Sequence, residues 1–141
     1  MGHLGLTPQS VHTLGGMKVQ ARTDAAVTIL TSEAHELERA GCFALVLECV
    51  PAEAAREVTN LLKIPTIGIG AGPGVSGQVL VYQDLIGLNP EFKPKFLRTY
   101  ANAFEIIQAA LNAYDDDVKS GNFPSDSESY SQIHQLNREV A

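Results

Sequence analysis

Residues 42–51, Cys42-Phe-Ala-Leu-Val-Leu-Glu-Cys-Val-Pro51, decide the fold. The run is apolar apart from Glu48, and it predicts a strand over residues 42–49 that is buried on both faces of a parallel sheet. Pro51 then suits the first turn of a helix, which we predict over residues 52–62. Glu48 therefore lies near the carboxyl end of a strand that leads into a helix, and parallel α/β folds carry their functional residues at that end.

Glu48 is the residue in this strand that needs an explanation. An ionised, unpaired carboxylate in a dry interior costs roughly several kcal/mol, so a chain keeps one only where a partner, a metal or a reaction requires it. Two structural explanations stand beside a functional one, since Glu48 can pair with Arg56 or interact with the amino end of the helix that follows Pro51.

Strand-like runs alternate with amphipathic patterns along the rest of the chain. We predict strands over residues 2–6, 42–49, 65–69 and 78–82. We predict helices over residues 24–40, capped by Asp24 and ended by Gly41, over residues 52–62, and over residues 95–119. This alternation predicts an α/β fold with about four parallel strands and flanking helices.

Four such strands are half of an eight-fold βα barrel, which needs about 250 residues. We therefore predict that residues 1–119 form a half-barrel and that the polar residues 120–141 form a mobile tail. Strand-like sequence follows Met1 at once, as it would if the chain were a fragment that starts inside a larger protein. A half-barrel leaves two parallel edges and an apolar face exposed, which predicts self-association.

Composition narrows the range of functions. The net charge of −6 counts against nucleic acid or an anionic membrane as partner. No apolar stretch approaches the roughly 20 residues of a membrane span, so we expect a cytoplasmic protein. Cys42 and Cys49 are predicted to be reduced thiols in the core.

Four blocks of the sequence resemble one enzyme family. They are Gly2-His-Leu-Gly-Leu-Thr-Pro-Gln-Ser-Val11, Gly15-Gly-Met-Lys-Val-Gln-Ala-Arg22, Leu45-Val-Leu-Glu-Cys-Val-Pro51 and Ile64-Pro-Thr-Ile-Gly-Ile-Gly-Ala-Gly72. In this order they resemble the C-terminal half of ketopantoate hydroxymethyltransferase (3-methyl-2-oxobutanoate hydroxymethyltransferase). The resemblance implies a (βα)8 barrel of the TIM type, of which this chain carries units 5–8.

The resemblance also implies an activity, a metal and partners. The enzyme transfers a hydroxymethyl group from 5,10-methylenetetrahydrofolate to 3-methyl-2-oxobutanoate, which gives 2-dehydropantoate (ketopantoate) for pantothenate and coenzyme A biosynthesis. It depends on Mg²⁺ and forms a large homo-oligomer. The family's metal and substrate motifs belong to the N-terminal half, so we expect no metal ligands in this chain and no activity without a complementary N-terminal half. The alternative is a catalytically incomplete truncated subunit or relic that only binds a ligand or a partner subunit.

Two residues match the family's active site. Glu48 matches the catalytic base, the proton acceptor, which must lie close to the carbon beside a ketone. His3 matches a histidine that faces the active site from a barrel strand, where a neutral imidazole can hydrogen-bond the 2-oxoacid. The alternative for His3 is a core histidine whose ring is bonded to a backbone carbonyl.

Two further features have no assigned role. The glycine-rich residues 68–77 fail the G-x-G-x-x-G spacing and precede a strand, so they are no dinucleotide fingerprint. We expect a loop in which small residues let backbone amides approach a ligand, or a plain tight turn. Asp84 is expected just past a strand end, where it more readily caps a helix or loop than acts in catalysis. No cofactor-binding residue is assigned.

Overall fold

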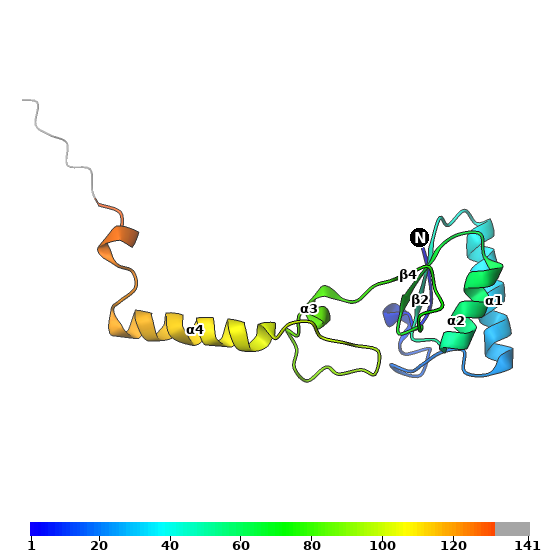
Figure 1. The fold of residues 1–141 in the computed structure, drawn as a ribbon, viewed down its shortest axis with the longest axis horizontal. Helices are drawn as coiled ribbons and strands as arrows, with labels where there is room; N and C mark the ends of the chain where they lie inside the picture. Colours follow the sequence, from blue (N-terminus) through cyan, green and yellow to red (C-terminus); the bar gives the residue numbers. More distant parts are fainter. Residues whose placement is uncertain (132–141) are drawn as a thin grey trace, which may run out of the picture. The chain divides into compact units, whose positions relative to one another are not determined.

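The computed structural model describes residues 1–131 and divides into two compact units, Met1–Ala101 and Asn102–Ala141. The first unit contains a four-stranded sheet (Figure 1). Its strands are β1 (Gly2–Gly5), β2 (Leu45–Glu48), β3 (Thr66–Ile69) and β4 (Gly77–Gln78). All three pairings are parallel and the strands lie in the order β1-β2-β3-β4. The predicted α/β fold of four parallel strands is therefore confirmed, and its sequential strand order is that of a βα barrel.

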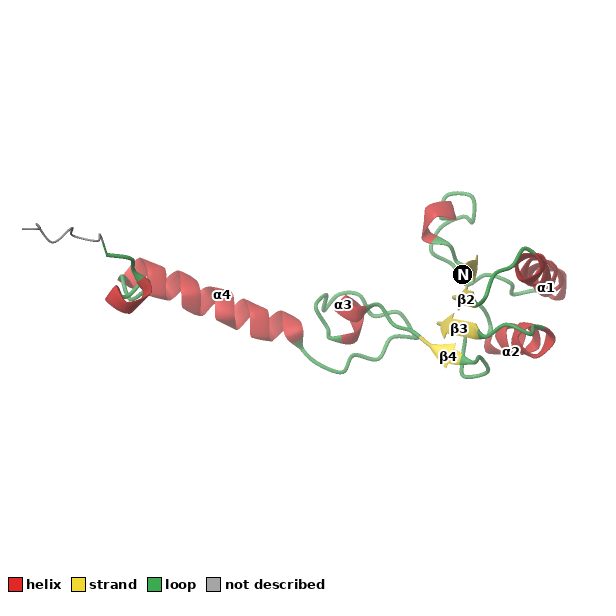
Figure 2. Cartoon of the chain, turned by 90° about the horizontal axis from the view of Figure 1, so that it is seen from above, coloured by secondary structure: helices red, strands yellow, loops and turns green. Residues whose placement is uncertain are grey.

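Two helices cover one face of this sheet, α1 (Asp24–Arg39) and α2 (Ala52–Leu61), as Figure 2 shows. Leu45 and Leu47 of β2 point to this face and are fully buried. The core around them is completed by Leu30, Ala34, Val50, Ala54, Ala55, Val58 and Ala71. The alternation of side chains places Val46 and Glu48 on the opposite face. Neither α1 nor α2 covers that face, so the expectation that the strand at residues 42–49 is buried on both faces is wrong within this unit.

The strands are shorter than predicted. β2 begins at Leu45, where its pairing with both neighbours starts, opposite Gly2 of β1 and Thr66 of β3. It ends at Glu48 because Cys49 has a φ of 49°, a left-handed conformation that no strand continues. The predicted strand over residues 78–82 is wrong beyond Gln78. Tyr82 instead begins a short helix, α3 (Tyr82–Leu85).

The helix predicted over residues 95–119 begins later, as α4 (Ala103–Ser120). Asn102 caps it, since its side-chain oxygen accepts a hydrogen bond from the backbone N–H of Glu105 at 3.4 Å. The backbone N–H of Tyr100 donates to the carbonyl of Leu85 at 2.8 Å, which holds the preceding segment against α3.

The ends of α1 differ by one residue from the prediction. Thr23 is the cap, because its hydroxyl accepts from the N–H of Ala26, and Asp24 is the first helical residue. Gly41, with a φ of 92°, follows the helix as predicted.

As far as residue 131, the second unit contains α4 and a short 3₁₀ turn, η2 (Asp126–Glu128). Gly121 ends α4 in a left-handed conformation, with a φ of 75°. The predicted mobile tail is described only as far as residue 131, and residues 132–141 of it lie outside the described residues. The predicted domain boundary after residue 119 stays a prediction. Within residues 1–131, no helix has the length and apolar character needed to cross a membrane.

Candidate functional site

Glu48 is held in place through the backbone on both sides. Its carbonyl accepts a hydrogen bond from the N–H of Leu6 at 2.8 Å, and the next residue, Cys49, donates its N–H to the carbonyl of Ile69 at 2.9 Å. Gly5 is opposite Glu48 in the β1–β2 register and has a φ of 88°. A Cβ atom at Gly5 would collide with the carbonyl oxygen of Glu48, so this end of the strand pair requires glycine.

His3 and Glu48 come together on the face of the sheet that α1 and α2 leave open. The Nε2 atom of His3 lies 3.0 Å from a carboxylate oxygen of Glu48, and their side chains are 31% and 17% exposed. The alignment does not make this contact a hydrogen bond, and Nε2 is buried without a hydrogen-bond partner among the described residues. A ring nitrogen of His3 and the carboxylate of Glu48 are thus adjacent polar groups, and a buried polar atom without a hydrogen bond carries a free-energy cost that a bound polar group would relieve.

The specific contacts expected for a structural role of the two residues are not found among residues 1–131. Within residues 1–131, Glu48 forms no ion pair with Arg56. The cap of α2 is Pro51, and no side chain caps that helix. The Nε2 atom of His3 has no hydrogen-bond partner in this part of the chain, so the backbone-carbonyl contact of the core-histidine alternative is not made by that atom. The sequence prediction thus selected two residues that the fold brings together.

The part of the chain that the structure describes contains no cluster of candidate metal ligands. No group of three or more His, Cys, Asp or Glu side chains in residues 1–131 is placed to hold a metal ion. Mg²⁺ requires several hard oxygen ligands in near-octahedral geometry, and Glu48 supplies one carboxylate.

The remaining sequence candidates lie elsewhere. Asp84 is inside the first turn of α3, so its expected place at a strand end is wrong. In the glycine loop, a Cβ at Gly72 would collide with Ala52, and a Cβ at Gly74 would lie 2.7 Å from the side chain of Arg56. These two glycines therefore let the loop pack closely against α2.

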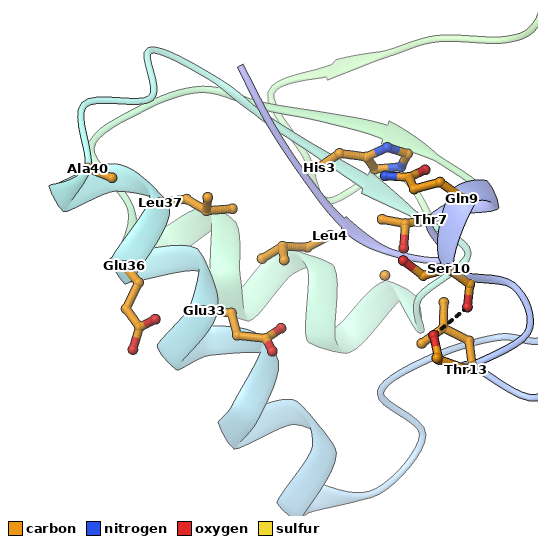
Figure 3. Close-up of a pocket in the computed structure, with 12 residues that line it drawn as sticks. His3, Leu4, Thr7, Gln9, Ser10, Thr13, Glu33, Glu36, Leu37 and Ala40 are labelled. Carbon is orange, nitrogen blue, oxygen red and sulfur yellow. Dashed lines mark hydrogen bonds between the residues drawn. The ribbon is translucent and has the colours of Figure 1, made fainter.

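A groove of about 690 Å³ runs along β1 (Figure 3). His3 and Leu4 line it from β1, and Glu33 and Glu36 from α1. The segment that contains the 3₁₀ turn η1 (Pro8–Ser10) contributes Thr7, Gln9, Ser10, Thr13 and Leu14. Glu48 does not line this groove. The volume of the groove alone does not make it the catalytic cavity. We place the candidate site at the contact between His3 and Glu48.

Sequence analysis missed two residues of this site, Gly5 and Cys49. A glycine inside an apolar strand run is a signal of close backbone approach, and Gly5 carried that signal. Cys49 carried none, because a cysteine with positive φ is unusual. Burial raises the pKa of the Cys49 thiol, and the neighbouring charge of Glu48 raises it further.

Comparison with known proteins identifies the family. The family model of ketopantoate hydroxymethyltransferase matches residues 1–126. A 3-methyl-2-oxobutanoate hydroxymethyltransferase of Coxiella burnetii (strain CbuK_Q154) is 56% identical over 124 residues, which is 88% of this chain and 47% of that protein. A relative of the same name from Bdellovibrio bacteriovorus is 56% identical over 131 residues, 93% of this chain and 50% of that protein.

A third relative extends the match to the end of the chain. It is 3-methyl-2-oxobutanoate hydroxymethyltransferase 2 of Bradyrhizobium diazoefficiens, 53% identical over 141 residues, which is 100% of this chain and 48% of that protein. The chain spans about half the length of these curated relatives. On this evidence the chain belongs to the ketopantoate hydroxymethyltransferase family.

Proposed function

We propose that this chain supplies the proton acceptor, Glu48, and a substrate-binding polar group, His3, to a hydroxymethyltransferase active site. The reaction joins the one-carbon unit of 5,10-methylenetetrahydrofolate to C3 of 3-methyl-2-oxobutanoate. With one water consumed, the products are 2-dehydropantoate and tetrahydrofolate. The proton leaves C3 as the new carbon–carbon bond replaces the C3–H bond.

The observation that carries the proposal is the contact between His3, within β1, and Glu48, at the carboxyl end of the paired strand β2. A carboxylate is a base of the right kind for a proton beside a ketone, provided that it lies within about 3 Å of that carbon's hydrogen. The unpaired Nε2 of His3, next to the same carboxylate, supports a role as hydrogen-bond donor to an oxygen of the 2-oxoacid. Together they orient one small ketoacid with its acidic C–H toward Glu48.

The remaining parts of the activity belong to the same proposal. Mg²⁺ and the folate co-substrate are expected from the family resemblance, and residues 1–131 contain no cluster of three or more candidate metal ligands. We therefore propose that the chain acts with a complementary N-terminal half, within a cytoplasmic homo-oligomer, and is inactive without that half.

Glu48→Gln tests the proposal. The chain is combined with the part of the Bdellovibrio relative that it does not match, and formation of 2-dehydropantoate is measured. An amide keeps the shape of the side chain but accepts no proton, so turnover should fall about 10²- to 10⁴-fold. The matched control is Glu53→Gln, which removes an exposed carboxylate from α2 and should leave turnover unchanged.

Unfolding by urea separates this result from a folding defect, since both variants should unfold close to the parent chain. Equal turnover of the Glu48→Gln variant and the parent complex would remove Glu48 from the reaction.

A further inference from the structure

A second cavity lies at the carboxyl end of the sheet, within the first unit. It has a volume of about 350 Å³, inside the range of about 300–1,000 Å³ that is typical of small-molecule sites. Gly70 and residues 78–80 line it from the ends of β3 and β4, and residues 95–98 and Tyr100 line it from the segment before α4.

The charge of this cavity stands out in an acidic protein. Lys95 and Arg98 both line it, and no Asp or Glu does. Residues 93–98 carry three of the ten Lys and Arg residues of a chain whose net charge is −6. Neither Lys95 nor Arg98 forms an ion pair within the described part of the chain. Two cations without a counter-charge raise the local affinity for an anion.

Gly70, which lines this cavity, lies close to Glu48 in the sheet and is in contact with Phe96. Ile69 is opposite Glu48 in the β2–β3 register, and Gly70 follows it directly. A Cβ built on Gly70, which has a φ of 64°, would lie 2.9 Å from the ring of Phe96 and 3.4 Å from the Sγ atom of Cys49. The ring of Phe96 therefore packs on the backbone of Gly70, one residue beyond the position that pairs with Glu48.

We propose that this cavity binds the carboxylate end of the second substrate, with Lys95 and Arg98 as the anion-binding residues. Arg98 offers a guanidinium fork that matches a carboxylate, and Lys95 adds a second cation. Phe96 and Tyr100 offer ring surface to a flat apolar part of the same ligand. The identity of the ligand rests on the proposed function, because a folate ends in a glutamate attached to an aromatic ring. The existence of an anion site at Lys95 and Arg98 does not rest on the proposed function.

The test measures binding to the 141-residue chain and needs no turnover. The probe is 4-aminobenzoyl-glutamate, followed by calorimetry or by ligand-detected NMR, at low and at high salt. Lys95→Gln and Arg98→Gln should each weaken binding about three- to tenfold, since charge-assisted hydrogen bonds at exposed positions are lost. Lys93→Gln is the matched control. It removes a cation two residues away that does not line the cavity, and binding should change less than about twofold.

Gly70→Ala provides a second variant that changes no charge. The added methyl group displaces the ring of Phe96, so binding of the probe should weaken although both cations remain. Inorganic phosphate serves as the competing anion.

Absence of binding to the folded parent chain would overturn the proposal, as would equal weakening by all three charge variants. Tighter binding of phosphate than of the probe, with the same dependence on Lys95 and Arg98, would overturn the assignment to a carboxylate ligand. Loss of probe binding in the variants together with full activity of the Glu48→Gln complex would leave this site standing and reject the proposed function.

Discussion

Two glycines with left-handed backbones, Gly5 and Gly41, differ in what surrounds them. Gly5 has a φ of 88° and lies against the carbonyl of Glu48, whereas Gly41 has a φ of 92° and no atom within 4 Å of the place a Cβ would take. Comparing Gly5 with Gly41 therefore separates two free-energy costs of adding a side chain, which usually occur together. One is the backbone strain of a side chain at positive φ, and the other is collision with a neighbour.

We expect Gly5→Ala to destabilise the chain by about 2–4 kcal/mol, since strain and collision add. The same change at Gly41 should cost only about 1 kcal/mol, because strain acts there alone. Urea unfolding of the two variants measures the difference. Equal losses of stability in the two variants would show that the contact between Gly5 and Glu48 relaxes without a free-energy cost.

Gly5→Ala should also weaken the reconstituted activity. Leu6 directly follows Gly5 and donates its N–H to the carbonyl of Glu48, so a shift of the backbone at Gly5 disturbs this hydrogen bond. The carboxylate proposed as the proton acceptor thus depends on Gly5, which lies against the backbone carbonyl of Glu48.

At the scale of elements, Glu38 connects two helices to the sheet. It lies in the last turn of α1, and its carboxylate accepts the backbone N–H of Lys63 at 2.6 Å and that of Ile64 at 3.2 Å. These two residues lead from α2 into β3. The hydrogen bond from Lys63 is the main cause that holds the pKa of Glu38 below its ordinary value.

Glu38→Gln should therefore lower stability at neutral pH, and the loss should disappear in acid. A carboxyl group whose pKa is lower in the folded state stabilises the fold above its unfolded pKa. That contribution is lost as the pH falls through the lower, folded value. Thermal unfolding of the parent and the variant between pH 7 and pH 3 should show two curves that converge. Glu36→Gln, an exposed change on the same helix, is the control. Curves that stay parallel down to pH 3 would contradict this role of Glu38.

The elements also show where sequence reasoning succeeds. The apolar run around Leu45 and Leu47 and the apolar spacing of α1 are strong local patterns, and both were placed within a few residues. Phe96 and Tyr100 have the spacing of a helix, but they lie outside α4, because Phe96 packs on Gly70 and the N–H of Tyr100 donates to Leu85. Contacts between distant segments overrode a helical periodicity that was real but misleading.

In the candidate site too, residues marked by a local pattern or a family match could be predicted from the sequence, and features that depend on contacts between distant segments could not. Glu48 was visible in the sequence because a carboxylate interrupts an apolar strand, and His3 because it matches a family residue. The cavity at Lys95 and Arg98 was not visible, since it depends on how residues 95–100 fold back to Gly70.

At the scale of the whole molecule, the sheet of the first unit is open on both sides. Among residues 1–131, β1 and β4 each pair with one strand, and the face that carries Glu48 is not covered by α1 or α2. Phe43, just before β2, is 68% exposed. Open parallel edges next to apolar surface favour association.

We therefore expect the purified chain to self-associate at micromolar concentration, and a complementary half to suppress this association. Sedimentation velocity measures both effects, with the chain alone and with an equimolar amount of the complementary half. A compact monomer that is stable on its own would show that the open edges are harmless.

The open edge of β1 has a consequence for the exchange of amide protons with solvent. Gly2 donates its N–H to the carbonyl of Ala44, just before β2, and Leu6 donates to that of Glu48. The alternation along β1 therefore directs the N–H groups of His3 and Gly5 away from β2. In the chain alone, deuterium should replace the protons of His3 and Gly5 rapidly while Leu6 stays protected. Once another strand pairs along β1, the same two amides become slow. One strand of four residues thereby records, at single-residue resolution, whether the barrel has been completed.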